Sequence, residues 1–155
     1  APGSIEVRGS KDSKVVATEK HETTGEPVSI RLTADRAEIN ADGEDLAILT
    51  VEALDKEGRP VPTASNLISF KVSGEGALIG VGNGDPNCQQ SDKQPKRSLF
   101  SGLAQVIVQS TKKPGEILIE AVTDDPDSAE LTPVKLAITT KKVDLRPAVP
   151  PVREA

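Results

Sequence analysis

Aromatic residues are nearly absent from this sequence, which contains two Phe and neither Tyr nor Trp. Stacking platforms for bases or sugar rings need aromatic faces, so a binding site of that kind is not expected. The single Cys excludes an internal disulfide, and one Cys with one His is too few for the usual ligand set of a zinc site. No apolar run approaches the roughly 20 residues of a membrane span. We therefore predict neither a membrane partner nor a cofactor.

The charge balance is mildly acidic, with 19 Lys and Arg against 24 Asp and Glu and a net charge of −5. Nucleic acids and anionic membranes attract clustered Lys and Arg, so we predict that nucleic acid is not a partner either. The 155 residues fit one domain of ordinary size, or one domain with part of a neighbour. Because the sequence starts at Ala1 and contains no Met, we expect it to be a piece of a longer protein.

Apolar and polar residues alternate along much of the chain, which is typical of half-buried β-strands. These runs are separated by turn residues and not by stretches of helical period, so the pattern predicts an all-β sandwich. The clearest strands are 46–54, 67–73, 103–110, 116–123 and 131–140. We expect the core to contain Phe100 and the inward side chains of these strands, namely Leu49, Val51, Ile68, Phe70, Val72, Val106, Val108, Leu118 and Leu136.

Three segments lie outside this pattern. Residues 1–25 hold two short strand candidates and predict a hairpin that needs further partners, because two strands alone are marginally stable. We expect this hairpin to be disordered, to lie on the sandwich, or to self-associate with another copy through the strand edges of Ala1–Glu22. Residues 85–98 form a long polar loop without an apolar anchor. Residues 143–155 are interpreted as a Pro-rich tail or linker.

The polar loop contains a small group of basic residues, Lys93, Lys96 and Arg97. Clusters of this size are usually solvated surface, and we expect the same here. Cys88 lies in the same loop, where an exposed thiol would be able to cross-link two chains. His21 has no partner spacing that predicts a hydrolase triad, so we interpret it as a surface residue on a polar strand.

The segment formed by Gly82, Asn83, Gly84 and Asp85 predicts a tight turn whose glycines permit positive φ. It lacks the Lys-Ser/Thr ending of a phosphate loop, so we favour a structural turn and keep a surface that contacts other domains as the alternative. Asn83 and Asp85, with Asp125 in a later acidic turn, are weak candidates for cation binding. Calcium requires more oxygen ligands than these side chains supply, so we predict no metal site.

Four motifs in register are similar to one known family: LTADR at 32–36, ADG at 41–43, GVGNGDP at 80–86 and VIVQST at 106–111. In these motifs the chain resembles the last immunoglobulin-like domain of many bacterial β-galactosidases of glycoside hydrolase family 2. The resemblance implies an immunoglobulin-like β-sandwich with Greek-key antiparallel sheets over residues 26–142. Residues 1–25 resemble the closing hairpin of the preceding domain in those enzymes.

The resemblance implies a parent enzyme that hydrolyses β-galactosides or related glycosides with a pair of carboxylates. Neither catalytic Glu motif of the family occurs in this sequence, so we assign no catalytic residue to it. We expect a non-catalytic C-terminal accessory module that braces other domains of a periplasmic or secreted hydrolase. Two alternatives stay open: a carbohydrate-binding module, against which the lack of aromatic residues argues, and an immunoglobulin-like adhesion or stalk domain.

Overall fold

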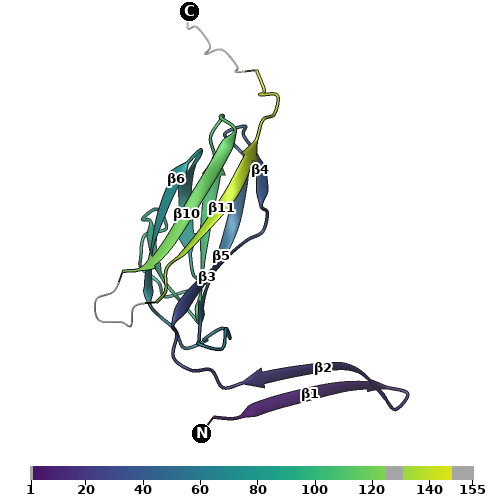
Figure 1. The fold of residues 1–155 in the computed structure, drawn as a ribbon. Helices are drawn as coiled ribbons and strands as arrows, with labels where there is room; N and C mark the ends of the chain where they lie inside the picture. The colour runs from purple at the N-terminus through teal and green to yellow at the C-terminus, as the bar shows by residue number, and fades with distance from the viewer. Residues whose placement is uncertain (1, 125–130, 148–155) are drawn as a thin grey trace, which may run out of the picture.

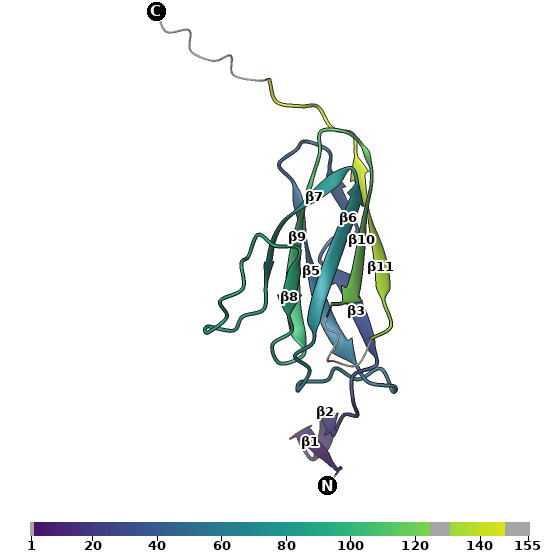
Figure 2. The same ribbon diagram turned by 90° about the vertical axis from the view of Figure 1, so that its left-hand side faces the viewer.

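The structure is a computed structural model that describes residues 2–124 and 131–147. These residues form eleven β-strands and no helix, so none of them belongs to a helix that could cross a membrane. β1 (Ser4–Lys11) and β2 (Lys14–Glu22) make a separate two-stranded sheet. The other nine strands make a sandwich of two layers (Figures 1 and 2).

One layer is a four-stranded sheet in the order β3-β5-β9-β7, and every neighbouring pair in it is antiparallel. Burial alternates along β3, β5 and β9, as expected for pleated strands that face the core on one side. The bounds of these strands are β3 (Ser29–Ala34), β5 (Leu46–Leu54), β7 (Gly76–Gly82) and β9 (Leu103–Ser110).

The other layer is a five-stranded sheet in the order β4-β11-β10-β6-β8. Its pairs are antiparallel except β4 with β11, which run parallel. The two orders correspond to the ABED and CFG sheets of an immunoglobulin sandwich, with β4 and β8 added at the edges. The predicted fold class is therefore confirmed. The bounds are β4 (Glu38–Asn40), β6 (Leu67–Gly74), β8 (Lys96–Ser98), β10 (Gly115–Thr123) and β11 (Val134–Lys141).

The hydrophobic core lies between the two layers. Along β5 the inward set Ala47, Leu49, Val51 and Ala53 is fully buried, and burial of each large side chain contributes about 1.5–3 kcal/mol before conformational entropy is subtracted. Most of the predicted core is confirmed. The buried members are Leu49, Val51, Ile68, Phe70, Val106 and Val108, while Val72 and Leu136 are partly buried against them.

Two core predictions were wrong. Leu118 points out of the sandwich and is 37% exposed, whereas its neighbours Ile117 and Ile119 are fully buried. Because successive side chains of a strand face opposite sides, an error of one residue moves the whole inward set to the other face. Phe100 is 44% exposed because it precedes the turn between β8 and β9, where its backbone exchanges two hydrogen bonds with Leu103.

The β1–β2 hairpin extends from the end of the sandwich opposite to the end of β11 (Figure 1). Every residue of both strands is exposed, including Ile5, Val7, Val15 and Val16. The hairpin therefore does not lie on the sandwich, and that expectation is wrong for this structure. Beyond β11, residues 142–147 have no regular secondary structure, and the rest of the predicted tail falls outside the described residues.

Candidate functional site

The Gly82–Asp85 turn follows β7 at the end of the sandwich from which the hairpin extends. Gly84 has a φ of 77°, so the turn uses the backbone freedom of glycine as predicted. The Asn83 side chain spans the turn: its Nδ2 donates to the carbonyl of Ser98 at 2.9 Å, and its Oδ1 accepts from the Asp85 amide at 3.1 Å. Asn83 thereby links the end of β7 to the end of β8.

A pocket of about 280 Å³ lies beside this turn, on the outer side of the four-stranded sheet. Its walls are Gly82, Asn83 and Gly84 from the turn, Thr50 from β5, and residues 103–105 from β9. Leu103, the first residue of β9, is 42% exposed beside this pocket.

The candidate cation ligands have structural partners. The Oδ1 atoms of Asn83 and Asp85 accept backbone amides of Asp85 and Asn87, the pattern of consecutive Asx turns. Across residues 2–124 and 131–147, no three His, Cys, Asp or Glu side chains are grouped as a metal site requires. Asp125, the third candidate, lies outside the described residues.

Arg97 differs most from the sequence-based expectation. It was predicted to be solvated, but it is only 2% exposed and points inward from β8, opposite Ile68 of β6. Its Nη2 contacts the Asp92 carboxylate and donates to the carbonyl of Val81 at 3.2 Å. Its Nη1 lies 2.9 Å from the sulfur of Cys88. The buried guanidinium thus links Cys88 and Asp92 of the polar loop to β7.

Other contacts attach the same loop to the sandwich. The Val81 amide donates to the carbonyl of Asp92 at 3.0 Å, and the Lys93 ammonium donates to the carbonyl of Ile79 at 3.0 Å. The Gln90 side chain exchanges two hydrogen bonds with Ser98. The expected absence of apolar anchors is correct, but polar contacts replace them. Figure 2 shows this loop at the left, between β7 and β8.

A second polar centre lies where the hairpin joins the sandwich. Asp55 is 2% exposed and accepts the amides of Gly25, Glu57 and Arg59 at 2.9–3.0 Å. Burial raises the pKa of Asp55, but the hydrogen bonds from Gly25 and Arg59 outweigh burial and hold this pKa well below its ordinary value. The guanidinium of Arg59 also reaches Glu22 of β2 at 3.5 Å. Sequence analysis did not identify this attachment of the hairpin.

His21 lies on the exposed hairpin, where its Nε2 is 3.5 Å from a carboxylate oxygen of Glu19. The pKa of the nearby Glu22 is lowered by its hydrogen bond and attraction to Lys20. The side chains of His21 and Glu22 lie on an exposed strand surface and not in a cleft. The arrangement is that of ion pairs on a solvated sheet.

Comparison with known proteins shows the family of this chain. A sequence model described as glycoside hydrolase family 2 C-terminal domain 5 matches residues 30–132. The chain is 42% identical over 123 residues to the β-galactosidase BoGH2A of Bacteroides ovatus, a match that covers 79% of this chain and 14% of that enzyme. It is 34% identical over 122 residues to a β-glucuronidase of Formosa agariphila, covering 77% of this chain and 12% of that enzyme.

A solved structure of a glycosyl hydrolase family 2 member from Bacteroides cellulosilyticus matches with a TM-score of 0.84 and 32% identity. That match covers 92% of this chain and 18% of the larger one. The chain therefore spans a small part of the relatives that it matches, and this part corresponds to an accessory C-terminal domain and not to the catalytic one. The resemblance that the four motifs carry is confirmed. The chain belongs to the glycoside hydrolase family 2 C-terminal domain 5 family.

Proposed function

We propose that this domain is the C-terminal brace of a complete enzyme that hydrolyses β-galactosides or closely related β-glycosides. The observation that carries the proposal is the match of residues 30–132 to the family, together with 42% identity to a β-galactosidase. The structure supports a mechanical role. A core of fully buried aliphatic side chains makes the sandwich a rigid body, and a rigid body can fix the positions of the domains that it contacts.

The Gly82–Asp85 turn is the proposed contact with the parent's other domains. In the strand register, Gly82 lies opposite Gln105 near the start of β9, and Leu103 lies opposite Glu52 near the end of β5. The turn, its pocket and the Asp55 centre thus share the end of the sandwich from which the hairpin extends. A turn at that end can contact the domain to which the hairpin leads.

We also propose that residues 1–25 complete the preceding immunoglobulin-like domain of the parent. The full exposure of β1 and β2 supports this, since an isolated hairpin is marginally stable and its strands have open edges. Residues 26–142 would then be the sandwich itself, and 143–155 the segment that follows it. Self-association of the hairpin edges is the alternative use of the same surface.

Deletion of residues 26–142 from the complete enzyme tests the proposal. The complete enzyme should hydrolyse a chromogenic β-galactoside, and the 155-residue chain alone should not. Deletion should lower the thermal midpoint of the enzyme or change its oligomeric state, measured by calorimetry and analytical ultracentrifugation. An unchanged midpoint, oligomer and activity would contradict a bracing role. Assaying a β-glucuronide in parallel distinguishes the two substrate classes named among the relatives.

A further inference from the structure

The outer faces of the two sheets differ in their chemistry. On the four-stranded sheet, the outward side chains of β5 and β9 are largely neutral, with Ile48 directly opposite Ile107. Among the described outward positions of β3, β5, β7 and β9, two residues are charged, Arg31 and Glu52. They form an ion pair in which the Arg31 guanidinium lies 2.8 Å from the Glu52 carboxylate. We call this surface the neutral face: Leu46, Ile48, Thr50, Leu103, Gln105, Ile107 and Gln109.

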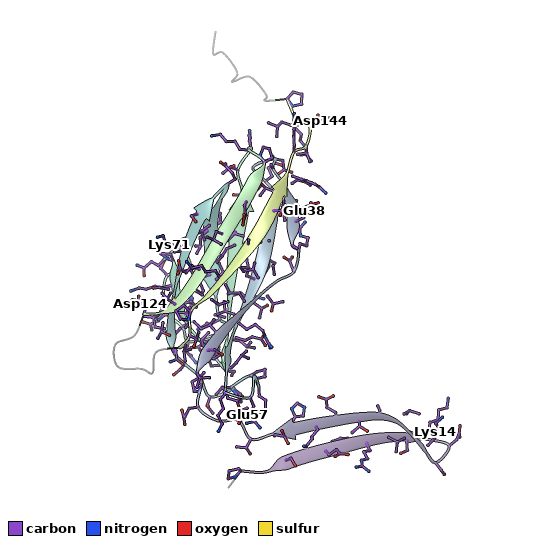
Figure 3. All side chains as sticks on the ribbon, viewed as in Figure 1. Lys14, Glu38, Glu57, Lys71, Asp124 and Asp144 are labelled. Carbon is purple, nitrogen blue, oxygen red and sulfur yellow. The ribbon has the colours of Figure 1, made fainter. Side chains whose placement is uncertain are left out.

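The outer face of the five-stranded sheet carries alternating charges instead. Lys135 pairs with Glu120 at 3.3 Å, and Lys141 pairs with Glu38 at 3.0 Å. Lys71 of β6 is exposed on the same sheet. Figure 3 labels Glu38 and Lys71 on the sheet nearest the viewer. Exposed ion pairs of this kind contribute little to stability, but they keep a sheet surface compatible with water.

Small residues make close approach to the neutral face easy. Gly80 lies opposite Ile107 and Gly82 lies opposite Gln105, so β7 presents little side-chain volume there. The pocket of about 280 Å³ opens on this face beside the exposed Leu103. Apart from the Arg31–Glu52 pair beside Leu103, the described outward strand positions of this sheet carry no charge, and depletion of charge is the compositional mark of the centre of a protein interface.

We propose that the neutral face packs against another domain of the same enzyme, while the charged face stays in water. The inference rests on the proposed function, because the occupant belongs to the complete hydrolase. The matched segment is 14% of the β-galactosidase relative and 18% of the solved hydrolase, so most of such an enzyme lies outside this chain and is available to cover the face. The neutral face is also continuous with the Gly82–Asp85 turn, and an apolar side chain of the neighbouring domain would fill the pocket.

Leu103 and Leu118 provide a matched pair for the test, because they are 42% and 37% exposed on opposite faces of the sandwich. Leu103→Cys and Leu118→Cys are each introduced into the 155-residue chain and into the complete enzyme. Labelling by a water-soluble maleimide is followed at each position by peptide mass spectrometry, which separates the new thiol from Cys88. In the isolated chain both positions should react at similar rates.

In the complete enzyme, Leu103→Cys should react at least about tenfold more slowly than in the isolated chain, since a buried interface must open before labelling. Leu118→Cys should keep its rate. Equal labelling of the two positions in an enzyme that hydrolyses glycosides would overturn the inference and leave the proposed function intact. Protection of Leu103→Cys in a complete protein without glycosidase activity would support the inference and reject the proposed function. Protection that grows with the concentration of the isolated chain would identify a second copy as the occupant and overturn the inference.

Discussion

Truncation of Ile119 tests which face of β10 points into the core. Ile119 is fully buried in the central strand of the five-stranded sheet, opposite Leu136 of β11 and Val72 of β6. Ile119→Ala removes three buried carbon atoms, worth about 0.8 kcal/mol each, and leaves a cavity that adds a further cost. We expect the free energy of unfolding to fall by about 3–4 kcal/mol. For a domain of this size, that loss corresponds to a decrease of roughly 6–16 °C in Tm.

Urea unfolding of the 155-residue chain measures this loss, and the adjacent Leu118→Ala is the matched control. Leu118 is 37% exposed, so its truncation should cost less than about 1 kcal/mol. The denaturant dependence should stay the same in both variants, because each keeps the fold. If Leu118→Ala costs as much as Ile119→Ala, the strand has the orientation expected from sequence and the register argument fails.

Three further predictions concern the turns and the polar centres. Gly58 and Gly102 both have a φ of 77°, but only at position 102 would an added side chain overlap a neighbouring carbonyl oxygen. Gly102→Ala should therefore lower the Tm of the chain more than Gly58→Ala does. Equal losses in the two variants would refute the steric argument. Asp55 has a folded pKa below its unfolded value, so its stabilisation is present above about pH 4 and is lost as the pH falls. Asp55→Asn should therefore flatten the acid side of the curve of stability against pH, and parallel curves for variant and wild type would count against this. Arg97→Met should accelerate amide hydrogen exchange in residues 85–95, and unchanged exchange would show that the guanidinium does not hold the loop.

The polar loop shows where sequence reasoning reached its limit. Sequence analysis found no apolar anchor in residues 85–98, and it placed Arg97 with the solvated basic residues because small basic clusters are usually surface. The structure buries Arg97 because β8 pairs with β6 and directs this side chain inward, where the Asp92 carboxylate and the Val81 carbonyl accept its hydrogen bonds. The Val81 carbonyl belongs to β7, outside the loop, so the composition of the loop could not identify this partner.

The fold class was predictable because each strand of a sandwich buries one face, and period-two alternation records this locally in strands such as β5. The family was predictable because the motifs that carry the resemblance are continuous in sequence. Tertiary structure alone decided the orientation of Ile117, Leu118 and Ile119, since three consecutive apolar residues carry no alternation. Tertiary structure also decided which residues form the neutral face, because the charges of an outer surface depend on which distant strands pair into the same sheet.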